Sequence, residues 1–246
     1  MVEITTISVV FFMIDSFCLW KTQFEQSTFT MPSNWQITGA YSANRVYVCA
    51  GKSIVGGYGI VGAGSTIQGS FSNLPTHTTI KVQINVYYLQ SWDEETASIN
   101  VGGLVFYRMW DQNWGVNPIC VTGIGKVFLE TIQGSHSADT LQIIIATNLN
   151  ENSYNESIGI REVYIYLKTP KCVQFYSECN YTGTMKEWCQ GSPNLQRKNR
   201  PQQIKSIKLN CCGIVTLTKK GQGSITITEN VPCLTEFDFP LVNNVN

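Results

Sequence analysis

The sequence predicts an all-β protein in which a β-sandwich is followed by a small, disulfide-rich domain. Two observations support this class. Apolar residues alternate with polar ones at a period of two, and six of the nine cysteines lie in the C-terminal third. Alternation over about four to eight residues is typical of half-buried strands, and many such strands with frequent turns indicate a sandwich or barrel. A chain of 246 residues is long enough for two domains.

The strongest strand signal lies between Ile80 and Tyr88, where every second residue is apolar and the intervening ones are mostly polar. Further strands are expected where β-branched and aromatic residues gather. These are Leu104–Trp110, Lys126–Ile132, Leu141–Ala146 and Ile160–Leu167. Glycine- and asparagine-rich turns separate them, and no capped window keeps a helical period.

The segment Lys168–Lys171 is predicted to be a linker, because cysteine density rises sharply beyond it. We therefore expect a first domain over residues 21–167 and a second over residues 172–246. A domain of about 75 residues buries only a modest core, and disulfides commonly supplement one of that size.

The cysteines predict an oxidised chain. In the first domain Cys49 and Cys120 are expected to pair with each other. Six cysteines remain in the second domain and allow 15 pairings, among which the sequence does not choose. They are Cys172, Cys179, Cys189, Cys211, Cys212 and Cys233. Cys211 and Cys212 are adjacent in an expected strand, so they should face opposite sides and bond to different partners.

Residues 1–20 are predicted to form a signal peptide. The stretch Ile7–Trp20 has the length of its apolar core and is too short for a membrane span, which takes about 20 residues. Glu3 and Asp15 depart from the usual pattern. The alternative is a buried N-terminal strand carrying Cys18 as a free thiol. Removal of the leader after Cys18 would leave an even number of cysteines, as a fully oxidised secreted chain requires.

Composition and short motifs agree with secretion. Asn155 and Asn180 each begin an N-glycosylation sequon. The 17 basic and 17 acidic residues give no net charge, which disfavours nucleic-acid binding. Charged residues make up only 14% of the chain, against about 25% in typical domains, and such a surface suits assembly or adhesion.

The C-terminal domain resembles the β/γ-crystallin family. The resemblance rests on Cys172-Val-Gln-Phe-Tyr176, on the spacing of Tyr176, Tyr181 and Gly183, and on the serine-bearing strand Ile204–Leu209. It implies a Greek-key fold. The family's calcium-binding stretch aligns with Pro201–Ser206, where proline, glutamine and lysine replace the usual acidic and hydroxyl ligands, so we expect no calcium site there.

The first domain is similar to a β-sandwich module of ciliate surface and secreted proteins. The residues that carry the similarity are Gly56-Gly57-Tyr58, Leu74-Pro-x-His77, Gln90-Ser-Trp92-Asp93-x-Glu95 and the closing segment Glu156–Val163. The closing segment also resembles galactose-binding-like jelly rolls, which implies a jelly-roll-like sandwich. Ciliate granule cargo proteins also carry C-terminal β/γ-crystallin domains, so the combination implies granule cargo or an extracellular coat.

The most site-like feature is the acidic turn Trp92–Glu95. Two or three carboxylates at a strand-to-strand turn could hold calcium, and Asp93 and Glu95 are the candidate ligands. The alternative is a solvated acidic turn with Trp92 packed on the sandwich edge. Gln90 stands where similar modules carry aspartate, which weakens the metal interpretation. No other cofactor is expected.

Other chemistry finds little support in the sequence. The glycine pattern Gly57–Gly62 matches a dinucleotide fingerprint, but it lacks the strand and helix that this site needs. The two histidines, His77 and His136, have no spacing that implies a nucleophile and base, so no catalytic residue is predicted. No C-x-x-C pair supports zinc. Aromatic candidates for a sugar site are Tyr58, Tyr107, Trp110 and Trp114.

The sequence thus favours a secreted, non-enzymatic structural component of a secretory-granule core or an extracellular filament or coat. Its partners would be copies of itself or other coat and granule proteins, held through rigid β domains. The alternative is a carbohydrate- or calcium-dependent binding module. Self-assembly that persists in chelator and free sugar would favour the first of these.

Overall fold

The computed structural model describes residues 4–10, 17–114, 117–120, 124–169, 172–189, 204–209, 214–219 and 223–235. The chain divides into two compact units, one of Leu19–Lys168 and one of Met1–Cys18 with Thr169–Asn246. The first unit begins and ends close to the domain limits expected from the sequence. The second contains the expected C-terminal domain and also the N-terminus of the chain.

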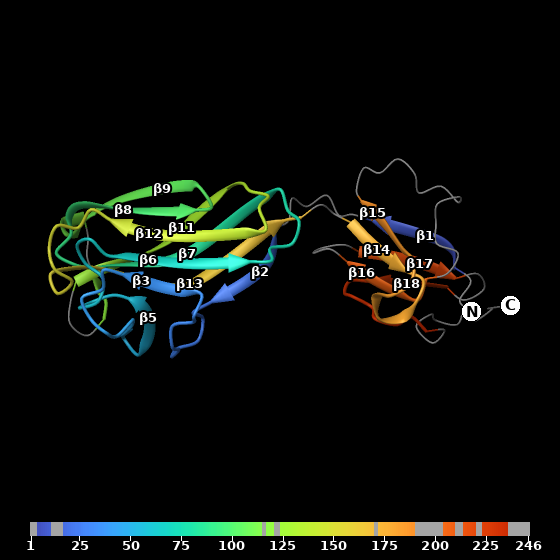
Figure 1. Ribbon diagram of the computed structural model, residues 1–246, viewed down its shortest axis with the longest axis horizontal. Coiled ribbons are helices and arrows are strands. Elements are labelled where there is room, and N and C mark those ends of the chain that lie inside the picture. Colours follow the sequence, from blue (N-terminus) through green and yellow to red (C-terminus); the bar gives the residue numbers. More distant parts are fainter. Residues whose placement is uncertain are drawn as a thin grey trace. The chain divides into compact units, whose positions relative to one another are not determined.

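The first unit is a sandwich of two antiparallel sheets. The larger sheet runs β10-β11-β7-β13-β5-β4, with β2 also pairing with β13, and the smaller runs β3-β6-β12-β8-β9 (Figure 1). The strands of the larger sheet are β2 (Cys18–Gln23), β4 (Val46–Cys49), β5 (Lys52–Gly56), β7 (Thr79–Gln90), β10 (Asn117–Pro118), β11 (Ile124–Ser135) and β13 (Glu156–Lys168). Those of the smaller are β3 (Trp35–Thr38), β6 (Thr66–Ser72), β8 (Asp93–Val101), β9 (Leu104–Asp111) and β12 (Thr140–Thr147). A short 3₁₀ turn, η1 (Gln112–Trp114), follows β9.

The period-two alternation of β7 is the reason why the sandwich forms. All five of its alternating apolar side chains, from Ile80 to Tyr88, are fully buried. They share one core with inward-facing residues of the opposite sheet such as Ile99 and Ile143. The chain crosses between the sheets from β6 to β7 to β8, and again from β11 to β12 to β13, as it does in jelly-roll folds. The all-β fold class and the sandwich predicted from the sequence are confirmed.

The second unit contains two three-stranded sheets, ordered β15-β14-β16 and β1-β17-β18. Its strands are β1 (Ile4–Val10), β14 (Cys172–Tyr176), β15 (Met185–Cys189), β16 (Ser206–Leu209), β17 (Ile214–Lys219) and β18 (Gly223–Ile227), and η2 (Cys179–Tyr181) is a 3₁₀ turn. The buried core of this unit is small. Its residues include Val173, Phe175, Trp188, Val215 and Leu217. A core of this size fits the prediction that disulfides supplement it.

The residues behind the crystallin resemblance lie together in this unit. The hydroxyl of Ser206 donates to the Glu178 carbonyl at 2.6 Å and accepts from the Tyr181 amide at 3.0 Å. The rings of Tyr176 and Tyr181 meet edge to face, 5.9 Å apart. Gly183 has a φ of +78°, and a β-carbon there would lie 2.4 Å from the Ser177 hydroxyl, so this turn requires glycine. Membership of the β/γ-crystallin family stays a prediction.

Strand β1 lies within the stretch that the sequence predicted to be a leader. Its residues Ile4–Val10 pair antiparallel with β17, through contacts such as Ile7 with Leu217. The same residues agree with a strand and with a leader because an apolar, β-branched run suits both a β-strand and the core of a signal peptide. In the structure, part of this stretch thus forms an N-terminal strand, which was the alternative to a leader. Cys18 is buried at the start of β2. Cleavage of the leader stays a prediction.

Three disulfides join described cysteines. Cys49 bonds to Cys120 in the sandwich, with their α-carbons 4.4 Å apart. In the second unit Cys172 bonds to Cys189, and Cys179 bonds to Cys233. Cys211 and Cys212 lie outside the described residues. None of the helices within the described ranges has the length and apolar character that crossing a bilayer requires.

Candidate functional site

The turn between β7 and β8 is held from three sides. The Trp92 side chain is fully buried; its indole nitrogen donates to the Ser157 carbonyl at 3.0 Å, and its ring packs on Tyr88 with centroids 4.9 Å apart. The Ser91 hydroxyl donates to the Asn155 side chain at 2.8 Å. Trp92 is therefore part of the core rather than packed on the sandwich edge, and it offers no exposed ring for a ligand.

Three carboxylates meet above this tryptophan. Asp93 and Glu95 come from the start of β8, and Glu156 is the first residue of β13. One oxygen from each lies within 4.8 Å of the others. Asp93 is exposed, whereas Glu95 and Glu156 are buried. We call this set of three residues the acidic cluster. The structure thus brings the two predicted calcium ligands together and adds a third carboxylate.

The hydrogen bonds of the acidic cluster are unevenly distributed. Both oxygens of Glu95 accept hydrogen bonds, one from the Asp93 amide at 2.6 Å and one from the Asn150 side-chain nitrogen at 3.4 Å. Glu156 is different. Its Oε2 atom is buried and has no hydrogen-bond partner among the residues that the structure describes. A buried carboxylate oxygen without a partner is uncommon, because desolvation without a compensating contact costs free energy.

The electrostatics of the acidic cluster disfavour negative charge. Burial raises the pKa of Glu156 to about 7, and the negative charges of Glu95 and Glu151 add to this effect. Burial likewise raises the pKa of Glu95, and its interaction with the Asp93 side chain adds to the rise, whereas the hydrogen bond from the Asp93 amide opposes it. A group of carboxylates that repel one another in a partly desolvated place is stabilised when a cation joins it.

Glu156 was not among the residues predicted from the sequence to bind a ligand. It lies far along the chain from the Trp92–Glu95 turn and reaches it only because β13 pairs with β7, where Glu156 stands opposite Gln90. One local signal was present. Glu156 opens a segment whose next residues are buried in succession, from Ser157 to Ile160. An acidic residue at the buried start of such a strand is unusual without a partner.

The aromatic residues considered for a sugar site differ in exposure. Trp110 is buried and packs near Trp92, with ring centroids 6.2 Å apart, so it cannot stack on a sugar. Tyr107 is exposed on β9, and Tyr58 is partly buried with its ring against that of exposed Tyr154. The side chain of Trp114 lies outside the described set. These positions are too scattered to define one stacking platform.

The two histidines meet, which the sequence did not predict. The Nδ1 atom of His77 lies 2.6 Å from the Pro75 carbonyl, and its Nε2 lies 2.7 Å from Nδ1 of His136. A carbonyl only accepts, so Nδ1 of His77 carries a proton and neutral His77 accepts from His136 through Nε2. The rings are stacked with centroids 5.0 Å apart. The pair joins the segments before β7 and after β11, and burial lowers the pKa of His136, as does His77.

The histidine pair predicts a pH dependence of stability. Because the pKa of His136 is lower in the folded protein than in the unfolded chain, the unfolded chain binds the proton more readily. The stabilisation from neutral His136 is therefore complete above about pH 6.5, the unfolded pKa. It is lost as the pH falls from there through the folded-state pKa. Wild-type protein should lose more stability than His136→Gln between pH 7 and pH 5 in chemical denaturation. Equal losses in the two proteins would contradict this assignment.

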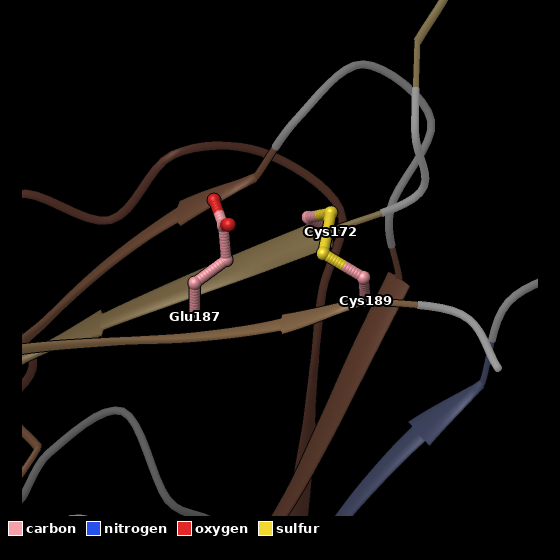
Figure 2. Close-up of side chains that lie close together, drawn as sticks. All are labelled: Cys172, Glu187 and Cys189. Atoms are coloured by element: carbon pink, nitrogen blue, oxygen red, sulfur yellow. A yellow bond between two sulfur atoms is a disulfide. The ribbon is translucent and has the colours of Figure 1, made fainter. Parts of the chain in front are cut away.

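A second group of metal-ligating residue types lies in the small unit. Cys172, Glu187 and Cys189 are close together, but the two sulfurs are bonded to each other (Figure 2). The cysteines stand directly opposite in the pairing of β14 with β15. Sulfurs joined in a disulfide are not the thiolates that bind metal ions, so this group is structural while it is oxidised.

Strand β9 (Leu104–Asp111) lies at the edge of the smaller sheet (Figure 1), and we call this strand with its unpaired side the β9 edge. One side of β9 pairs with β8, and no other strand in the described parts of the chain pairs with its free side. Three apolar side chains on the outer face are exposed, namely Val105 at 48%, Tyr107 at 67% and Met109 at 50%. Their neighbours Phe106 and Arg108 are less exposed. The β9 edge therefore combines free backbone groups with an apolar row.

Both sequon asparagines are exposed. Asn155 lies just before Glu156, and Asn180 lies in η2 with a φ of 58°. The exposed position of each is compatible with a carbohydrate chain, and glycosylation stays a prediction.

Comparison with known proteins leaves the family open. No protein-family model matches the sequence, and neither does a curated protein. Among solved structures, one similar chain is the N-terminal part of Clostridium thermocellum endo-1,4-beta-D-xylanase 10B, a CBM22-1 and GH10 module pair in complex with xylohexaose. The two chains share 12% identity at a TM-score of 0.29, over 68% of this chain and 29% of the xylanase chain. No conclusion about this protein follows from a TM-score this low.

Proposed function

We propose that this protein is a secreted, non-enzymatic structural component that assembles with copies of itself through the β9 edge. The setting that we propose is a secretory-granule core or an extracellular filament or coat. The resemblance of both domains to ciliate secreted proteins supports this setting, as do the disulfides and the two exposed sequon asparagines. The observation that carries the proposal is the exposed apolar row of the β9 edge.

The β9 edge differs from the other sheet margins in length and protection. Sheet edges are commonly kept short, or protected with charge or proline, because free edges pair with other chains. Among the other outer strands of the sandwich, β2 has six residues, β3 and β4 have four each, and β10 has two, one of them Pro118. Strand β9 has eight residues, and its exposed row carries no charge. An edge of this kind is suited to pairing with a second copy.

The charge of the chain supports self-association. With 17 basic and 17 acidic residues, two copies meet without net repulsion. An antiparallel pairing of β9 with β9 of a second copy would place the same apolar row on both sides of a two-fold axis. The other outer strands of the sandwich are shorter than β9, so we propose a dimer through β9 as the first unit of a larger assembly.

Replacing Tyr107 with lysine should abolish assembly. The substitution puts a charge at the centre of the exposed row, which is the natural means of blocking edge pairing. Sedimentation velocity over a concentration series should show wild-type protein forming dimers or larger species and Tyr107→Lys remaining a monomer. Tyr154→Lys is the matched control, since Tyr154 is also an exposed tyrosine of the sandwich but lies outside β9. A wild-type monomer at every concentration, or assembly by Tyr107→Lys, would refute the proposal.

A second candidate function is lectin-like or adhesive binding of carbohydrate. The exposed rings of Tyr107 and Tyr154 favour it, because aromatic faces stack on the apolar faces of sugars. The two functions separate in one assay. Self-association through the β9 edge should persist in excess free sugar, whereas adhesion through a sugar site should be competed away. A glycan-array screen of the Tyr107→Lys and Tyr154→Lys variants would then show which tyrosine contacts the sugar.

A further inference from the structure

The carboxylate of Glu156 is buried in the sandwich with one oxygen unpartnered. Its residue is 1% exposed, and its Oε2 atom makes no hydrogen bond to the described residues. Glu130, which is also 1% exposed, is instead paired with Arg108. Buried charges in proteins are normally paired or bound to a metal, because desolvation disfavours the charged form strongly. The Glu151 backbone interacts with the Glu156 carboxylate, but the buried Oε2 atom has no partner among the described residues.

The unpartnered oxygen belongs to a group that faces two further carboxylates. One oxygen each of Asp93, Glu95 and Glu156 lies within 4.8 Å of the others. Two oxygens bound to one calcium ion, each at about 2.3–2.6 Å, are at most about 5 Å apart. The spacing of the acidic cluster is thus that of ligands around a single ion. The charges that act on Glu156 are those of other carboxylates, namely Glu95, Glu151 and Asp93.

We propose that Asp93, Glu95 and Glu156 bind one calcium ion at the junction of β8 and β13. All three ligands supply carboxylate oxygen, the donor that hard cations prefer, and none supplies the nitrogen or sulfur that favours zinc. Calcium suits this set better than magnesium, because it accepts irregular geometry and one or two bidentate carboxylates. Exposed Asp93 leaves room for water to complete the coordination shell.

The ion would fasten two parts of the sandwich. Asp93 and Glu95 belong to the smaller sheet, whereas Glu156 belongs to the larger, so a shared ion joins the sheets at one end of the core. The site is separate from the exposed row of the β9 edge, although Asp93 pairs with Asp111 at the end of β9. Calcium binding is therefore expected in the monomer and does not depend on assembly.

The test uses the full-length protein in the Tyr107→Lys background, freed of metal with a chelator and then dialysed. Calcium is titrated by calorimetry, and terbium luminescence sensitised by tryptophan gives a second readout, because Trp92 adjoins Asp93 in sequence. The parent should bind one calcium ion, or one terbium ion at the same site. Calcium should displace terbium more effectively than magnesium does. Glu156→Gln should weaken calcium binding by about tenfold or more. Glu94→Gln, an exposed carboxylate of the same turn outside the acidic cluster, should bind as the parent does.

The melting temperature of Glu156→Gln shows whether this variant loses calcium binding merely because it is misfolded. In chelator, this variant should melt at or above the temperature of the parent, since it removes an unpartnered buried carboxylate. In the presence of calcium the parent should melt at the higher temperature, because only the parent gains stability from the bound ion. Absence of calcium binding by the parent, equal affinity in Glu156→Gln, or displacement of terbium by magnesium as readily as by calcium would overturn the proposal. The assembly proposal would stand in each of these cases, since it is tested by sedimentation.

Discussion

Replacing Arg108 with methionine should destabilise the sandwich by about 3 kcal/mol, since removal of one partner leaves a buried charge uncompensated. Glu130 on β11 has a side chain that is only 2% exposed. The Arg108 guanidinium donates to it through Nε and Nη2, and the Nη2 contact is 2.9 Å long. These hydrogen bonds raise the pKa of Arg108. The guanidinium also lies over the Phe128 ring at 4.2 Å, so Arg108 of the smaller sheet contacts β11 of the larger one.

The double variant Arg108→Met/Glu130→Leu is the control that separates charge from packing. Replacement of a whole buried pair by apolar residues is often neutral, so the double variant should regain most of the stability that Arg108→Met loses. Urea denaturation, followed by tryptophan fluorescence at a concentration where the chain is monomeric, measures both. If Arg108→Met were as stable as wild type, or the double variant no better than the single one, the ion pair would not have the role assigned to it.

Replacing Arg161 with methionine should cost about 3 kcal/mol or more. The Arg161 side chain is among the largest fully buried ones, and it donates to the carbonyls of Ser53 and Glu25, each at 2.7 Å. It also pairs with the Glu162 carboxylate at 3.1 Å. Hydrogen bonds from a charged donor are worth about 1.5–3 kcal/mol each, and the buried Ser53 carbonyl would lose its donor. Methionine fills the space but donates nothing.

Lysine at position 161 provides the matched comparison. It keeps the charge, but a single ammonium lacks the planar fork that reaches two carbonyls at once, so Arg161→Lys should lose an intermediate amount of stability. Thermal unfolding of both variants checks the order. A loss below about 1 kcal/mol for Arg161→Met would show that the carbonyls of Ser53 and Glu25 find other donors, contrary to the stated role.

The sheets could be predicted from the sequence because their signal is local. The alternation from Ile80 to Tyr88 depends only on neighbouring residues, and in the structure it becomes the buried face of β7. The linker at Lys168–Lys171, which the rise in cysteine density predicts, stays a prediction; β13 ends at Lys168. The N-terminal stretch carried two signals at once, since apolar residues serve a strand and a leader equally well.

The acidic cluster could be predicted only in part because its third member depends on pairing between distant strands. Asp93 and Glu95 share one turn and form a visible motif, whereas Glu156 reaches them only through the register of β13 against β7. The meeting of His77 with His136 depends in the same way on the pairing of β7 with β11. The exposure of the apolar row on β9 could not be predicted from the sequence either, because the order of strands in the sheet decides which strand lies at its edge.

Hydrogen exchange of the β9 amides, measured as a function of protein concentration, tests the proposed assembly most directly. Pairing with a second copy would protect the amides on the free side of β9, so their exchange should slow as the protein assembles. Exchange in β3, at the opposite margin of the same sheet, should not change, and Tyr107→Lys should show no concentration dependence. Assembly with β9 amides that exchange as rapidly as in the monomer would contradict the account.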